Sequence, residues 1–234
     1  MNIYILTSNK GIRIIEGLQY CINKYWKPNP PVIVLGYEKP FFKLDDNFKF
    51  ISLGKDKGPD YIGEDLINFF NNIKDKYFIF SVDDFFPIRD VNIDILNNLS
   101  DKIVNENISR IALTDQVSDK PYSNISELND YRIIEMGQEA NYRKSAVWSI
   151  WSKKYFLKYF YPKMNLWEWE LDERCKGDGH RIVGTNKRYV VQSCHLYKRG
   201  NLNHDWYKDS ESSDIMFGED HAIISDIIYL GKLI

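Results

Sequence analysis

Residues 77–86 constrain the fold of this chain more than any other stretch. Four apolar residues, 77–80, lead through Ser81 and Val82 to two adjacent carboxylates, Asp83 and Asp84. Such a run predicts a buried strand that stops at a charged edge. In an open α/β sheet, ligands bind just beyond the carboxyl ends of strands, where two acidic side chains can hold a divalent cation. The same residues also fit a turn with solvated aspartates, and the stretch alone leaves both interpretations open.

The first 86 residues alternate between short apolar runs and apolar stripes at helical spacing. The runs predict strands at 3–6, 32–35, 48–53 and 77–80, and the stripes predict helices at 14–25 and 62–73. This order is typical of an α/β fold, in which helices cover a mostly parallel sheet.

The remaining chain continues the pattern less regularly. We expect a helix at 93–103, a strand at 108–113, a loop-rich insertion at 114–138 with one strand at 131–136, a strand at 145–151, a helix from 166 to about 177, and a hairpin of 182–184 with 189–194. No linker is evident, so we expect one domain over 1–234, with a nucleotide-binding half (1–115) and an acceptor-binding half (116–234).

Charge and cysteine content limit the classes of protein. Lys plus Arg total 31 and Asp plus Glu total 33, which argues against nucleic-acid binding by bulk charge. Three cysteines without a CxxC spacing favour buried, inert thiols in a reducing compartment over a disulfide framework or a zinc site. Neither a signal peptide nor a membrane span is evident, so we expect a cytoplasmic protein whose tail could touch a membrane.

Trp167, Glu168, Trp169 and Glu170 form the strongest local signal after the aspartate pair. An aromatic face packs on the C–H face of a sugar, and a carboxylate accepts hydrogen bonds from its hydroxyl groups. A carboxylate in a partly desolvated aromatic site can also act as a general base. Asn165 followed by Glu168 fits a capping box equally well, so Glu168 has both a structural and a functional interpretation.

Histidines and basic residues near residue 200 offer further candidates. A neutral imidazole of His195 or His204 close to the aspartate pair would complete a metal site, and Lys198 and Arg199 could bind a diphosphate. Thr7 and Ser8 end the first strand, where an α/β sheet receives a nucleotide, although such residues are also ordinary helix caps.

Taken together, these motifs resemble the GT-A type of nucleotide-sugar glycosyltransferase. The resemblance rests on the strand that ends in Asp83, Asp84, Phe85 and Phe86, on the later run 145–151, and on the Trp-Glu-Trp-Glu helix start, in this order. It covers roughly residues 1–200.

The resemblance implies a Rossmann-like sheet, a UDP- or other nucleotide-sugar donor, a glycan or lipid-linked acceptor, and Mg²⁺ or Mn²⁺ as a Lewis acid for the leaving diphosphate. It places the metal on Asp83, Asp84 and His195 or His204, the acceptor against Trp167 and Trp169, and the base at Glu168 or Glu170. The donor would contact Thr7, Ser8, Asp83, Lys198 and Arg199.

One departure from the family's pattern bears on the metal. The family's acidic motif is Asp-x-Asp, and here Ser81 or Val82 stands where the first Asp would be. This leaves open a metal held by one carboxylate, charge neutralisation by basic residues, or no metal.

Two other functions also fit the sequence. A metal-dependent nucleotidyl- or phosphoryl-transferase would use the same aspartates but needs more carboxylates converging on them. A non-catalytic glycan-binding module would keep the Trp-Glu cluster without turnover.

Overall fold

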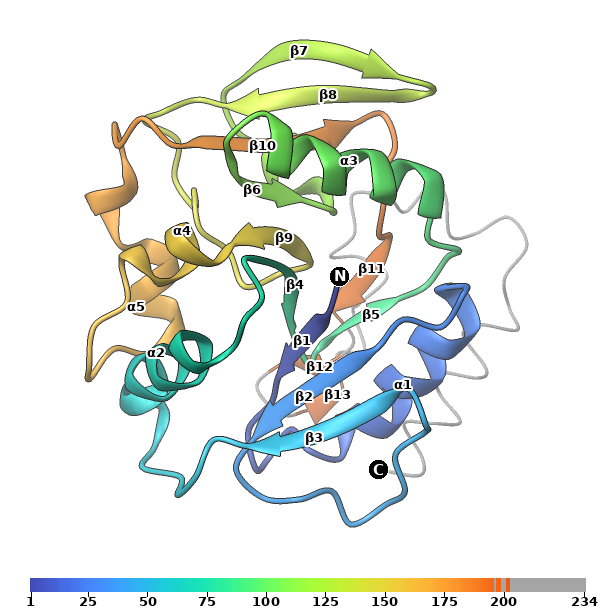
Figure 1. Cartoon of the computed structure of the whole chain (residues 1–234), viewed down its shortest axis with the longest axis vertical. Coiled ribbons are helices and arrows are strands. Elements are labelled where there is room, and N and C mark those ends of the chain that lie inside the picture. Colours follow the sequence, from blue (N-terminus) through green and yellow to red (C-terminus); the bar gives the residue numbers. More distant parts are fainter. Residues whose placement is uncertain (196, 199–200, 203–234) are drawn as a thin grey trace.

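The computed structural model describes residues 1–195, 197–198 and 201–202. Within these residues, nine strands form one sheet (Figure 1), in the order β3 (Phe48–Ser52), β2 (Val32–Gly36), β1 (Ile3–Leu6), β4 (Tyr77–Val82), β9 (Ser149–Ser152), β6 (Ile108–Ala112), β10 (Arg181–Asn186), β8 (Tyr131–Met136) and β7 (Tyr122–Leu128). The predicted sites Arg199 and His204 lie outside the described residues, and of Lys198 only the backbone is described.

Seven of the nine strands of the sheet run in the same direction. Strands β3, β2, β1 and β4 run in one direction, β9 is antiparallel to both of its neighbours, and β10 is parallel to β6. Strands β8 and β7 close the far edge as an antiparallel hairpin. The predicted α/β class, with a mostly parallel central sheet, is confirmed.

Helices cover both faces of the sheet. The α-helices of the described residues are α1 (Ile14–Tyr25), α2 (Ile62–Asn72), α3 (Ile93–Asn105), α4 (Lys153–Lys158) and α5 (Leu166–Leu171).

The alternation of side chains along β1 shows which helices share a face. Ile3 and Ile5 pack in one apolar core with α1 and α3, whereas Tyr4 and Leu6 pack in a second core with α2, α4 and α5. All four β1 side chains are buried, as expected for a central parallel strand.

The prediction of a hairpin from 182–184 and 189–194 is wrong. Strand β10 lies in the main sheet between β6 and β8, while β11 (Ser193–His195) pairs with β5 (Phe85–Pro87), the strand that follows the aspartate pair. Both runs are apolar because each is buried against a different partner. The pairing of β11 with β5 places His195 opposite Phe85.

Other predicted boundaries shift. The strand at 131–136 is confirmed as β8, but its exposed partner β7 was not predicted. The expected strand at 145–151 begins only with β9, and the expected helix from residue 166 ends at Leu171. There Asp172 adopts an extended backbone and its side chain accepts a hydrogen bond from the Arg174 N–H in a short 3-10 turn, Glu173–Cys175.

Three smaller observations complete the fold. Strands β12 (Tyr197–Lys198) and β13 (Asn201–Leu202) form a short antiparallel pair. All three cysteines are buried thiols, as predicted. Among the described helices, none has the length and apolar character needed to cross a bilayer.

Candidate functional site

A cavity of about 440 Å³ opens at the carboxyl ends of β1 and β4. The sequence-predicted residues that line it are Thr7, Ser8, Asp83, Asp84, Trp167, Glu170 and His195. The sheet thus brings together residues from four separate parts of the chain, at the edge where α/β proteins bind ligands.

Thr7 and Asp83 form the floor of the cavity. The Thr7 hydroxyl donates a 2.5 Å hydrogen bond to Asp83 Oδ2, which ties the end of β1 to the turn after β4. Burial raises the pKa of Asp83 to about 7, although the bond from Thr7 lowers it. Gly11 makes this packing possible, because a Cβ at that position would lie 2.0 Å from Asp83 Oδ2.

Asp84 is paired with His195. His195 Nε2 lies 2.9 Å from Asp84 Oδ2, and the imidazole stacks on Phe85 with 4.7 Å between ring centroids. The pairing of β5 with β11 sets this contact, since it places His195 beside Phe85. The other carboxylate oxygen, Asp84 Oδ1, is buried without a hydrogen-bond partner.

Glu170 reaches the cavity from α5. Its Oε1 accepts a 2.5 Å hydrogen bond from the backbone N–H of Ala146. Burial raises the pKa of Glu170 above its ordinary range, while the Ala146 N–H and the charge of Arg110 lower it. Glu170 is therefore a largely desolvated carboxylate held in a fixed orientation.

Glu168 and Trp169 have structural surroundings instead. Asn165 Oδ1 accepts a 2.9 Å hydrogen bond from the Glu168 N–H, and Glu168 Oε2 accepts one from the Asn165 N–H, which is a complete capping box. Trp169 is fully buried and stacks on Phe160 at 4.7 Å. Neither residue lines the cavity, whereas Trp167 does and is 71% exposed.

Residues 142–147, which we call the wall segment, form one wall, and its lining comes from Tyr142, Ser145, Ala146 and Val147. The sequence predicts a strand at 145–151 but does not single out Tyr142. Val82 N–H donates to the Ala146 carbonyl, so the backbone of Ala146 contacts both the end of β4 and Glu170. Tyr142 lies at the start of the segment with φ +56° and lines the cavity. Hydrophobic periodicity carries no signal for such a segment, because its role rests on backbone hydrogen bonds.

Fully buried cations anchor the wall segment from behind. Arg110 Nη1 donates to the carbonyl of Arg143 at 3.2 Å, and Arg143 donates from Nε to the Cys175 carbonyl at 2.8 Å. Lys144 Nζ donates to the Asp172 carbonyl at 3.0 Å. Burial lowers the pKa of Arg110 to about 10, so it remains charged at neutral pH.

The side chains that line the cavity carry negative charge. Asp83, Asp84 and Glu170 contribute carboxylates, and no lysine or arginine is among the described residues that line it. A diphosphate bound here would therefore need a cation.

The described residues contain no cluster of three or more histidine, cysteine or acidic side chains that could enclose a metal. Asp84 nevertheless fits a more open site, because its Oδ1 is buried without a partner and His195 lies beside it. Mg²⁺ is commonly held by one or two carboxylates together with substrate phosphates. The donor set thus suits a cation whose shell a phosphate completes.

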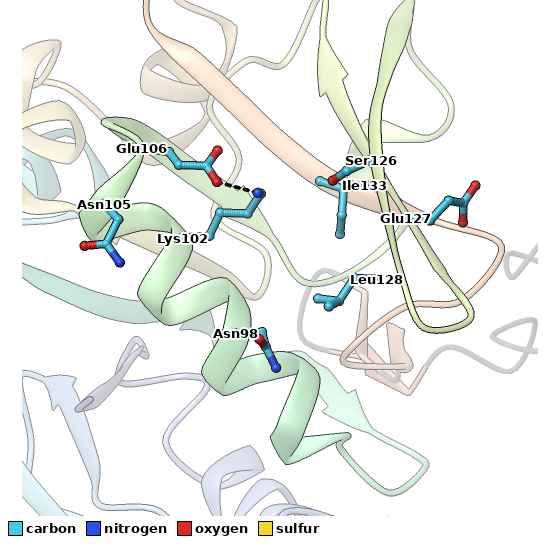
Figure 2. A pocket seen from close by; sticks show the side chains of 8 residues that line it. All are labelled: Asn98, Lys102, Asn105, Glu106, Ser126, Glu127, Leu128 and Ile133. Atoms are coloured by element: carbon cyan, nitrogen blue, oxygen red, sulfur yellow. Dashed lines mark hydrogen bonds and ion pairs between the residues drawn. The ribbon is translucent and has the colours of Figure 1, made fainter.

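Two further cavities hold none of the predicted residues. Figure 2 shows one of about 290 Å³ between α3 and the β7–β8 hairpin, where Lys102 pairs with Glu106 at 2.5 Å. The other, about 700 Å³, lies at the opposite edge of the sheet, beside the first residues of β1 and β4. It is larger than the candidate site, but its two carboxylates, Asp75 and Asp101, are accompanied by Lys74 and Lys76.

Comparison with known proteins gives similarity in structure alone. No protein-family model and no curated protein sequence matches the chain. The mannosyltransferase PcManGT from Pyrobaculum calidifontis, in complex with GDP-Man and Mn²⁺, is 10% identical with a TM-score of 0.51; the match covers 98% of this chain and 68% of that one. TarS 1–349 from S. aureus, in complex with UDP, is 10% identical with a TM-score of 0.50, over 80% of this chain and 58% of that one.

A UDP-glucose pyrophosphorylase complexed with UDP-glucose matches at 10% identity and a TM-score of 0.47, over 83% of this chain and 92% of that one, which is too weak to support an inference. The chain spans 58% of the length of TarS 1–349 and 35% of the longer TarS structure. The similarities at a TM-score of 0.50 or above show a GT-A-like α/β fold.

Proposed function

We propose that this chain is a glycosyltransferase that moves a sugar from a nucleotide-sugar donor, a UDP-sugar in the first instance, to a hydroxyl group of a glycan or other acceptor. One observation carries the proposal. The strand-end carboxylates and Glu170 line the same cavity at the carboxyl edge of the sheet, together with the exposed indole of Trp167.

The donor side is assigned to the first half of the chain together with His195. Thr7, Ser8 and Asp83 would contact the nucleotide where β1 and β4 end. Asp84 and His195 would hold Mg²⁺ or Mn²⁺ together with the donor's diphosphate. When bound, such a cation neutralises the charge of the departing nucleoside diphosphate.

The acceptor side is assigned to the second half. Glu170 would take the proton from the acceptor hydroxyl, because burial makes its carboxylate a stronger base than one in water. The Ala146 N–H fixes Oε1, and a side-chain hydrogen bond with Ser145 also helps to orient the carboxylate. Trp167 would support the acceptor sugar through its exposed ring.

The first experiment is a calorimetric titration of UDP, with and without Mn²⁺, into the wild type and Asp84→Asn. We expect metal-dependent binding in the wild type that falls at least tenfold in the variant, because a neutral amide is a poorer ligand for the cation. Asp46→Asn, at an exposed site outside the cavity, is the matched control and should bind as the wild type does.

Turnover with UDP-sugars then separates glycosyl transfer from nucleotidyl transfer. Release of UDP supports the proposal, whereas release of pyrophosphate overturns it in favour of nucleotidyl transfer. Absence of both UDP binding and consumption across a broad donor panel with Mn²⁺ would also overturn it.

A further inference from the structure

Tyr142 has an unusual backbone for a bulky residue. Its φ of +56° lies in the left-handed region, which residues with large side chains seldom adopt. Such a conformation costs on the order of 1–3 kcal/mol and persists only where the surroundings enforce it. Residues of this kind gather at binding sites, so the surroundings of Tyr142 need an explanation.

The surroundings that enforce this conformation are buried hydrogen bonds. Arg110 Nη1 donates to the Tyr142 carbonyl at 3.4 Å, and the next residue, Arg143, is fully buried. Besides its bond to Cys175, the Arg143 guanidinium donates to the Gly137 carbonyl at 2.9 Å and to Asp178 Oδ1 at 3.2 Å. Because Arg143 must point inward to meet these acceptors, the backbone is fixed on the side of Tyr142 as well.

The result is an aromatic ring kept at the cavity rather than in the core. Tyr142 is 44% exposed although its successor is fully buried. Lys120 Nζ lies 5.7 Å from the ring centroid and is itself paired with Asp119. A contact with Lys120 alone would not require the ring to line the cavity, so the position of the ring points to a ligand.

Two exposed aromatic rings therefore line one cavity from different elements, Tyr142 on the wall segment and Trp167 on α5. Aromatic faces pack against the C–H faces of sugars. On the acceptor side, the Glu170 carboxylate accepts hydroxyl hydrogen bonds but repels anions, and no lysine or arginine is among the described residues that line the cavity. The described lining thus suits an uncharged sugar better than a uronic acid.

We propose that Tyr142, together with Trp167, binds an uncharged pyranose ring of the acceptor and thereby determines acceptor specificity. This inference rests on the proposed function, because only a glycosyltransferase has an acceptor. The binding of a saccharide to the two rings can nevertheless be measured separately.

The test uses substitutions that suit the left-handed backbone. Tyr142→Gly and Tyr142→Asn remove the ring and tolerate positive φ, so their urea unfolding midpoints should stay close to that of the wild type. Tyr142→Phe keeps the ring. Lys187→Gly is the matched control, because Lys187 also has a positive φ, +69°, and lies outside the cavity.

Binding of neutral methyl glycosides (gluco, galacto, manno and N-acetylglucosamine) is measured by saturation-transfer NMR, with and without UDP and Mg²⁺. We expect the wild type to bind at least one of them, and more tightly than methyl glucuronide. The apparent Kd should rise about fivefold to tenfold in Tyr142→Gly and Tyr142→Asn, and less than twofold in Tyr142→Phe and Lys187→Gly. The affinity for UDP should be the same in all of them.

The outcomes distinguish the two proposals. Unchanged glycoside binding in Tyr142→Gly, or UDP binding without any glycoside binding in the wild type, overturns the role of Tyr142 and leaves the donor site standing. Preferential binding of the glucuronide overturns the preference for an uncharged ring. Glycoside binding that depends on Tyr142, with neither UDP binding nor consumption of any nucleotide sugar in the donor panel, supports the aromatic pair and overturns the glycosyltransferase.

Discussion

Gly11 occupies a position where any side chain would collide with the floor of the cavity. An added Cβ would lie 2.0 Å from Asp83 Oδ2 and 3.0 Å from Thr7 Oγ1. We therefore expect Gly11→Ala to displace Asp83, to break its bond with Thr7 and to lower the free energy of unfolding by about 1–3 kcal/mol. Urea denaturation measures the loss, and a UDP titration measures the effect on the site.

A double-mutant cycle identifies the cause of that loss. In an Asp83→Ala background the colliding oxygen is gone, so Gly11→Ala should cost clearly less than it does in the wild type. An equal cost in both backgrounds would show that the collision with Asp83 is not what makes glycine necessary.

Asp83 itself should make stability depend on pH. Its folded-state pKa of about 7 lies above the ordinary value of 3.8, so the folded protein holds a proton that the unfolded chain releases. The free energy of unfolding should then decrease as the pH rises from about 4 to about 7, and change little from this source outside that window.

Asp83→Asn isolates this effect, because the amide oxygen can still accept the bond from Thr7 but does not titrate. We expect the variant's free energy of unfolding to gain about 3 kcal/mol on that of the wild type between pH 4.5 and pH 7.5, measured by urea unfolding at both values. If the free energy of unfolding of the variant, relative to that of the wild type, instead fell as the pH rises, it would contradict the raised pKa of Asp83.

At the scale of elements, α5 presents two carboxylates in different surroundings. Glu168 closes the capping box, whereas Glu170 lines the cavity. Glu168→Gln should leave turnover within about threefold of the wild type, because glutamine also serves in a capping box. Glu170→Gln should lower kcat by about 10²–10⁴-fold if Glu170 is the base.

The two variants are compared by their turnover of a UDP-sugar with its acceptor. Circular dichroism checks that both remain folded. Each substitution removes one negative charge from the same helix, so the pair is matched. A larger loss of kcat in Glu168→Gln than in Glu170→Gln would reverse the assignment.

The elements also show what sequence reasoning could reach. The alternation of strands and helices up to residue 86 was predicted because parallel strands and their helices have strong, local hydrophobic patterns. Strand β7 was missed because it is polar and exposed, and β10 and β11 were wrongly paired because an apolar run does not reveal its partner.

The same limit applied to the site. Thr7, Asp84, His195 and Glu170 were predicted as site residues from residue type, and the structure places all four around one cavity. Tyr142 was missed because its position depends on contacts that Arg110 and Arg143 make with residues distant in the sequence. Type and spacing indicate candidate residues, but tertiary packing decides which of them meet.

On the scale of the whole molecule, two tryptophans two residues apart lie in opposite surroundings, one in the core and one at the surface. Trp169 is fully buried in the core that contains α2, α4 and α5, and Trp167 is 71% exposed. Trp169→Ala should lower the free energy of unfolding by about 3–5 kcal/mol, since it leaves a large cavity in that core. Trp167→Ala should change it by less than about 0.5 kcal/mol.

Chemical denaturation of both variants measures the contrast. Trp167→Ala should nevertheless weaken glycoside binding while UDP binding stays unchanged. Comparable destabilisation by the two substitutions would contradict the described burial of either ring.

The backbone of Ala146 connects the two sides of the cavity. It accepts a hydrogen bond from the end of β4 and donates one to Glu170, so the two sides of the cavity share a single main-chain support. The main chain, rather than the side chains that face the ligand, therefore sets the distance between the two sides. Exchanges in the lining can therefore alter which molecules fit while the spacing persists, and this architecture could evolve a new specificity without being rebuilt.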